Sequence, residues 1–255
     1  SDSVQRLASG LRINDAADDT GGLISSSHLG SVSSALKQGI ENGNSGLALV
    51  QLSNKALDNQ LDILNTIKEK LNVSKYDSTS SAGKDAIRLD VIELIAKLDD
   101  IASSVNYNNN YTLQKSDTDT DFSLSTTITL DRGAVTTQSI KSNSDGLSLG
   151  TLKNLTAGGL TGDVSVAQLD VIDTAITDID SYKNSFNLSQ VEIEIAVENL
   201  TSIEKATSNS RDKILNTNKN DENAILDKYK LLEKSSEFAM VQANITQATV
   251  LKLLA

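Results

Sequence analysis

No proline occurs anywhere in the 255 residues of this chain. At the usual frequency of about 5%, roughly thirteen prolines would be expected in a chain of this length. Proline removes a backbone donor and clashes with the preceding helical turn, so a chain without it can form long uninterrupted helices. Aromatic residues make up only 3% of the chain. That is too few for the bulky centre of a compact globule, so the composition favours elongated helices packed along narrow seams.

Apolar residues recur at helical spacing in the expected helices. Between residues 32 and 73, a seven-residue series holds Leu36, Val50, Leu57, Leu64 and Leu71, with a break at Gly43. A turn-rich stretch at 77–83 precedes a second helix over 87–105, and this short connection favours an antiparallel pair. From about residue 166 another seven-residue series runs from Ile172 to Ile214 and is interrupted at Thr207. Narrow stripes of this kind are typical of helical bundles and coiled coils.

The middle of the chain has a different pattern. Apolar and polar residues alternate between Phe122 and Leu130, which predicts a strand. A turn is expected at 131–133, a partner strand over 135–140, and loops with short strands from there to 162. Polar residues at 216–223 interrupt the helical pattern, and a last helix is expected from about Ala224.

The predicted fold is therefore mainly α. We expect an elongated antiparallel helical bundle or coiled-coil rod with a small middle segment that contains a β-hairpin. The predicted segments are 1–110 for the N-terminal part of the helical core, 111–165 for a β-rich variable middle, 166–220 for the long C-terminal helix of the core, and 221–255 for a terminal helix.

Composition also limits the chemistry that we expect. Cysteine is absent, which excludes disulfides, thiol nucleophiles and thiolate metal sites. A formal net charge of −11 argues against general binding to nucleic acid or to anionic membranes. The single histidine, His28, excludes the two-histidine HExxH zinc motif and is expected on a helix surface. No apolar run is long enough to cross a bilayer, and no signal peptide is visible. We expect no enzyme activity, no metal and no cofactor.

The stretch from Arg6 to Leu23 reads RLASGLRINDAADDTGGL and closely resembles the N-terminal signature of bacterial flagellins. Further matches cover Leu61–Lys68 and the C-terminal stretches Phe238–Met240 and Val250–Leu254. These are similar to flagellins of the Campylobacter and Helicobacter group. The chain departs from the family after Ile214, where Leu215–Asn218 replaces a common Arg-Asp-Val-Asp. The residues that usually precede the signature are also missing, so an N-terminally truncated flagellin is expected.

The resemblance implies a structural subunit that polymerises into the extracellular flagellar filament for swimming motility. It implies export through the flagellar secretion apparatus without a cleaved signal peptide. The implied partners are other copies of the chain together with junction, cap and export-chaperone proteins. Two alternatives remain, namely a hook–filament junction protein and a secreted flagellin-like adhesin or immune-modulating protein. In its truncated form the chain is expected to stay monomeric or to form only small oligomers.

The loop that carries the signature is the best candidate for a surface between subunits, because it is polar, charged and contains glycine at a helix junction. Its candidate interface residues are Arg6, Arg12, Asn14, Asp18 and Asp19. The carboxylates of Asp15, Asp18 and Asp19 lack the spacing of a known metal loop. We expect them instead to cap a helix start, and Asp18 and Asp19 to pair with Arg6 or Arg12 within or between subunits.

The segment from Leu64 to Val73 aligns with the helix by which the host's flagellin-recognising Toll-like receptor senses many flagellins. The equivalent positions of the receptor epitope are Leu64, Thr66, Lys68 and Glu69. Recognised flagellins carry arginine where this chain has Thr66. Because no other side chain reproduces the planar set of donors on a guanidinium, we expect weak or absent receptor activation.

Overall fold

The structure is a computed structural model that describes residues 2–107, 110–113, 125–127, 134–136 and 140–254. Six helices account for most of the described residues, which confirms the mainly α prediction. They are α1 (Asp2–Ser9), α2 (Thr20–Ser74), α3 (Ser81–Ser104), α4 (Gly150–Lys153), α5 (Gly162–Leu215) and α6 (Lys219–Leu254). Internal contacts divide the chain into two compact units. Unit 1 combines Ser1–Ala35 with Ile203–Ala255, and unit 2 is Leu36–Ser202.

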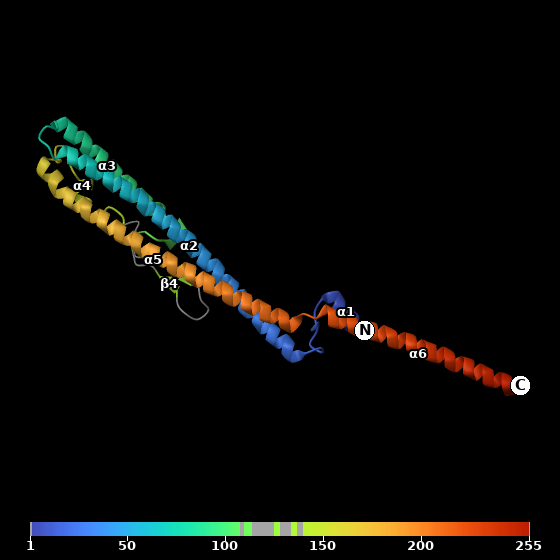
Figure 1. Cartoon of the computed structure of the whole chain (residues 1–255). Helices are drawn as coiled ribbons and strands as arrows, with labels where there is room; N and C mark the ends of the chain where they lie inside the picture. The colour runs from blue at the N-terminus through green and yellow to red at the C-terminus, as the bar shows by residue number, and fades with distance from the viewer. Residues whose placement is uncertain (1, 108–109, 114–124, 128–133, 137–139, 255) are drawn as a thin grey trace. The chain divides into compact units, whose positions relative to one another are not determined.

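Unit 2 is built on three long helical segments that lie side by side in Figure 1, from α2, α3 and α5. The predicted apolar series form its core, because Val50, Leu57, Leu64 and Leu71 of α2 are buried together with Ile172, Ile179, Phe186, Ile193 and Leu200 of α5. The predicted antiparallel pairing of α2 and α3 is confirmed, and the ammonium of Lys70 reaches the carboxylate of Asp90 at 2.6 Å. Narrow seams of aliphatic side chains thus replace the large aromatic core of a globular domain.

Three helices begin earlier than the sequence predicts, and a polar side chain caps the start of each. α2 begins at Thr20 rather than near residue 32. At this start, the carboxylate of Asp19 accepts a hydrogen bond from the Gly22 amide at 2.8 Å. α3 begins after Ser80, whose hydroxyl accepts from the Gly83 amide at 3.1 Å. α5 begins before residue 166, with the Thr161 hydroxyl bound to the Val164 amide at 3.2 Å. These side chains satisfy amides that a helix start leaves without partners.

Two short antiparallel strand pairs lie in the middle of the chain. β1 (Asn106–Tyr107) pairs with β2 (Asn110–Tyr111), and β3 (Ser125–Thr127) pairs with β4 (Ala134–Thr136). The β3–β4 pair confirms the predicted hairpin over these residues. The rest of the predicted strands and the turn at 131–133 lie outside the described residues.

The segment over 140–162 corrects the sequence-based expectation of loops with short strands. It forms turns and the short helix α4, and the described residues of this segment hold no strand. Long-range polar contacts fix its path, because Asp99 of α3 accepts hydrogen bonds from the Ser144 amide at 2.6 Å and the Lys153 ammonium at 3.0 Å. Buried Gln60 of α2 donates to the Ser142 carbonyl at 3.1 Å. Local sequence patterns do not reveal such distant partners.

Unit 1 brings together segments from both ends of the chain. α1 packs against the first turns of α6, and the two lie adjacent in Figure 1. Beyond this contact α6 is uncovered, because every residue from Asp227 to Ala243 is exposed. The predicted break before α6 is shorter than expected, since α5 ends at Leu215 and α6 begins at Lys219 rather than near Ala224. Between Asp227 and Ala243, the apolar side chains of α6 are thus open to solvent.

Candidate subunit-junction site

Residues 10–19 form the loop between α1 and α2, and the chain bends sharply where this loop starts. Gly10 adopts a positive φ of 74°, and its amide donates to the Arg6 carbonyl at 2.8 Å. This is the conformation in which glycine commonly ends a helix. The bend directs the following residues towards the link between α5 and α6.

Backbone hydrogen bonds join this loop to the link between α5 and α6. The Arg12 amide donates to the Leu215 carbonyl at 2.6 Å, and the Thr217 amide donates to the Gly10 carbonyl at 3.1 Å. The guanidinium of Arg12 adds a hydrogen bond to the Ile214 carbonyl at 3.0 Å. We call these contacts among residues 10–12 and 214–217 the clamp. It holds together two segments that are about 200 positions apart in the sequence.

The aspartates of the loop cap backbone amides, as the sequence predicts. Asp18 accepts hydrogen bonds from the amides of Asn14 at 2.9 Å and Asp15 at 3.3 Å, and Asp15 accepts from the Ala17 amide at 2.7 Å. The amides of Asn14 and Asp15 lower the pKa of the Asp18 carboxyl, and the positive charge of Arg6 contributes further. Hydrogen bonds to a carboxylate favour its charged form, so Asp18 binds the loop most strongly when ionised.

Gly22 is required at the start of α2 for a steric reason. A Cβ atom there would lie 2.6 Å from the Asp19 carboxylate and 2.6 Å from Cδ1 of Ile13. Ile13 is buried, and Asp19 caps the helix. The signature glycine therefore leaves space for both neighbours.

Arg6 links α1 to the loop and to α6. Its guanidinium lies 3.8 Å from the Asp18 carboxylate and 4.0 Å from that of Glu222. Glu222 is buried in the first turn of α6, beside a cavity of about 530 Å³ between α1 and α6. Sequence reasoning missed Glu222. Its only signal was an acidic residue in a first helical turn, where the helix dipole favours negative charge.

The structure brings all five candidate interface residues into one cluster. The predicted ion pairs form within the chain, since Arg6 approaches Asp18 and the Arg12 guanidinium lies 3.7 Å from the Asp19 carboxylate. Asn14 donates from its side chain to the Leu11 carbonyl at 3.3 Å. The cluster is thus organised by its own intramolecular contacts, and a role between subunits stays a prediction. His28 is exposed on α2, as predicted.

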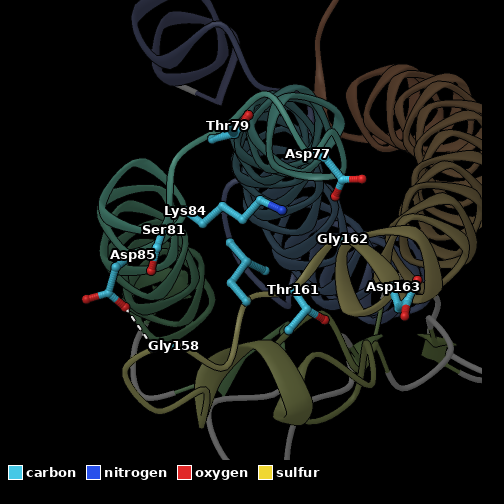
Figure 2. Close-up of a pocket in the computed structure, with 10 residues that line it drawn as sticks. Asp77, Thr79, Ser81, Lys84, Asp85, Gly158, Thr161, Gly162 and Asp163 are labelled. Atoms are coloured by element: carbon cyan, nitrogen blue, oxygen red, sulfur yellow. Dashed lines mark hydrogen bonds between the residues drawn. The ribbon is translucent and has the colours of Figure 1, made fainter.

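A polar groove of about 420 Å³ lies in unit 2 between the α2–α3 turn and the start of α5 (Figure 2). Lys84 extends into this groove, with Asp77 and Asp163 at its edges. On the outer side, Asp85 accepts from Arg88 at 2.8 Å and from the Gly158 amide at 3.1 Å, and these contacts lower its pKa.

The described residues contain no group of three or more side chains arranged to hold a metal ion. Among the described helices, none has the length and apolar character needed to cross a bilayer.

Comparison with known proteins identifies the two ends of the chain. Residues 1–118 match the family model of the bacterial flagellin N-terminal helical region, and residues 169–254 match that of the bacterial flagellin C-terminal helical region. The chain belongs to the bacterial flagellin family. The two segments that the clamp joins are therefore parts of the N-terminal and C-terminal flagellin regions.

The flagellin relatives include proteins from Helicobacter, as the sequence motifs indicate. Flagellin A of Helicobacter mustelae is 43% identical over 124 residues, which is 49% of this chain and 25% of that protein. A flagellin of Listeria monocytogenes is 27% identical over 273 aligned residues, covering 98% of this chain and 90% of that protein. The aligned part of this chain thus spans about a quarter of the length of the Helicobacter relatives. The crystal structure of Bacillus cereus flagellin shares the fold, with a TM-score of 0.50, 19% identity, and coverage of 63% of this chain and 88% of that one.

The four positions that the sequence predicts as equivalent to a receptor epitope lie along α2. Leu64 is buried in the bundle, whereas Thr66 and Glu69 are exposed. Lys68 is partly exposed and forms an ion pair of 2.5 Å with Asp173 of α5. Thr66 turns its hydroxyl back to the Asp62 carbonyl at 2.9 Å. The exposed helix surface at residue 66 therefore carries no projecting cation.

Proposed function

We propose that this chain is the structural part of a subunit that polymerises into the bacterial flagellar filament and serves swimming motility. The observation that carries this proposal is the pairing of both flagellin regions through the clamp, with a helical bundle in unit 2. Family membership supports a structural role rather than an enzymatic one. It also supports an extracellular location in the filament, reached through the flagellar secretion apparatus without a cleaved signal peptide.

The uncovered apolar side chains of α6 support assembly. Leu231 is 70% exposed and Phe238 is 76% exposed, and Met240 and Val241 are also open to solvent. Large exposed apolar surfaces of this kind usually mark sites of protein association. We propose that copies of α6 are covered in the inner part of the filament and that the residues from about 107 to 165 face outward.

The clamp cluster is the second proposed assembly element. Its residues would contact neighbouring subunits through the donors and acceptors that their intramolecular bonds leave available. These residues are Arg6, Arg12, Asn14, Asp18 and Asp19. Many weak contacts repeated along a polymer give a stable assembly although each contact is weak. Further proposed partners are the junction, cap and export-chaperone proteins of the same apparatus.

Electron microscopy and sedimentation test the proposed polymerisation. We expect filaments when this chain is preceded by the N-terminal segment of Helicobacter mustelae flagellin A and seeded with filament fragments. Persistent monomers of the extended form under seeded conditions would contradict the proposal.

We also propose weak or absent activation of the host's flagellin-recognising Toll-like receptor. The exposed position of Thr66 makes the direct test simple, because Thr66→Arg restores a guanidinium on an open helix face. Reporter cells should respond more strongly to Thr66→Arg than to the parent chain, with Asn65→Arg as the displaced control. A parent response equal to that of an arginine-bearing flagellin would refute this proposal.

A further inference from the structure

α5 carries apolar residues on two opposite faces. Leu188, Val191 and Ile195 are 68%, 51% and 59% exposed, whereas Phe186 and Ile193 of the same stretch are buried. At 100° per residue, the spacing of these three exposed residues places them in one row. We call this row the outer stripe. It lies on the side of α5 that faces away from the core of unit 2.

Acidic residues border the outer stripe. Glu192 and Glu198 are exposed on either side of Ile195, and within the described residues neither forms an ion pair. Glu194 is also exposed and accepts a hydrogen bond from Gln190 at 2.9 Å. A surface that covers the outer stripe must therefore combine apolar side chains with positive charge, because a second acidic surface would be repelled.

A surface with these properties lies on α2 of the same unit. Leu52 is 48% exposed, and its exposed neighbours at helical spacing are Ala48 and Lys55. Lys55 forms no ion pair among the described residues. We call Ala48, Leu52 and Lys55 the α2 patch. It offers a small apolar centre beside one cation, which complements the outer stripe.

One chain cannot bring its own two surfaces together. Asn54 of α2 donates to Asn187 of α5 at 3.0 Å, so these residues mark the side on which the two helices meet. Leu52 lies two residues before Asn54 and is rotated by about 200° away from that contact. The outer stripe likewise faces away from the core. Among the described residues of unit 2, neither helix can therefore cover the other's surface, and a second molecule is the candidate to do so.

We propose that the outer stripe of one subunit packs against the α2 patch of a second copy, with Lys55 between Glu192 and Glu198. This inference rests on the proposed function, since it names the surfaces through which the polymer makes lateral contacts. The two surfaces differ, so the contact is heterologous. An open assembly therefore has an unpaired outer stripe at one end and an unpaired α2 patch at the other. Such contacts generate open helical polymers unless the rotation closes a ring.

Disulfide trapping tests the proposed contact, and the absence of native cysteine means that only the introduced thiols can react. Full chains with Leu52→Cys and with Leu188→Cys are mixed in equal amounts, concentrated and oxidised. The inference predicts that the mixed 52–188 dimer forms in a larger proportion than random pairing with the 52–52 and 188–188 dimers would give. Leu89→Cys replaces Leu52→Cys in the control mixture, because Leu89 is similarly exposed on α3. That mixture should give random products.

Charge reversal supplies the second arm. Lys55→Glu should lower the yield of the mixed dimer. Combining it with Glu192→Lys and Glu198→Lys in the partner should restore that yield. The expected change in yield is about two- to fivefold per reversed pair. Random products, or an excess that Lys55→Glu leaves unchanged, would overturn the inference. Filaments in electron micrographs together with random products would overturn only this contact and leave the proposed function standing. An excess of mixed dimer without filaments from the seeded, extended form would support the contact and contradict the proposed function.

Discussion

Phe186 and Leu188 are two residues apart on α5 and face in opposite directions. Phe186 is fully buried in unit 2, whereas Leu188 is 68% exposed. Neighbouring apolar residues of one helix therefore serve two different surfaces. The side chain of Phe186 stabilises the bundle, and that of Leu188 is available to a second molecule.

Truncation at these two positions should have very different effects on stability. Phe186→Ala leaves a cavity in the core and should lower the free energy of unfolding by about 3–5 kcal/mol. Leu188→Ala should change it by less than about 0.5 kcal/mol, as is usual for exposed positions. Urea unfolding followed by circular dichroism measures both. Equal losses would contradict the assignment of the two faces.

Alanine at two adjacent glycines tests the start of α2. Gly22→Ala forces a Cβ against Asp19 and Ile13, so the lost cap should outweigh the helix propensity of alanine and cost about 1 kcal/mol. At Gly21 the nearest atom is 3.6 Å from the added Cβ. Gly21→Ala should therefore be neutral or stabilise by up to about 1 kcal/mol. Hydrogen exchange over residues 20–30 reports the local effect, and faster exchange in Gly21→Ala than in Gly22→Ala would reverse the prediction.

Removal of the Arg12 side chain should loosen the clamp without abolishing it. Arg12→Ala loses the bond to the Ile214 carbonyl and the ion pair with Asp19, but the backbone bonds remain. We expect a local loss of about 1 kcal/mol, seen as faster exchange of the backbone amides of residue 12 and Thr217. Lys205→Ala is the control, since Lys205 is an exposed residue of α5 in the same unit. Unchanged exchange in Arg12→Ala would show that the backbone bonds alone hold the clamp.

The loop around Asp18 should open in acid. The folded pKa of Asp18 is lowered below 3.8, chiefly by the amides of Asn14 and Asp15. The stabilisation is therefore fully present above about pH 3.8 and is lost as the pH falls through the lower folded pKa. NMR titration of the Asn14 amide should show this transition, and Asp18→Asn should remove it. A transition that persists in Asp18→Asn would assign it to another carboxylate.

The sequence predicts the bundle well because its information is periodic. Ile172, Ile179, Phe186, Ile193 and Leu200 repeat every seven residues, and all are buried. The series loses strength at Thr207, which is only partly buried in unit 1. A repeated stripe needs only a neighbouring helix to cover it, so its position can be inferred without knowledge of distant contacts.

Other features depend on contacts between distant residues and could not be predicted. The turns over 140–149 are held by Asp99 and Gln60, two residues that look ordinary on their own helices. The early start of α2 depends on the Asp19 cap and on the space that Gly22 leaves for Asp19 and Ile13. The serines and glycines in this stretch have weak helix propensity and so do not predict it. Glu222 is buried with the Arg6 guanidinium 4.0 Å from its carboxylate, and no local pattern connects these two residues.

The clamp has a mechanical consequence. The bonds from Arg12 to Leu215 and from Thr217 to Gly10 run in opposite directions between the two connecting segments. Neither segment can slide along the other without breaking both bonds. A pulling force on one connecting segment is therefore transmitted to the other through these bonds.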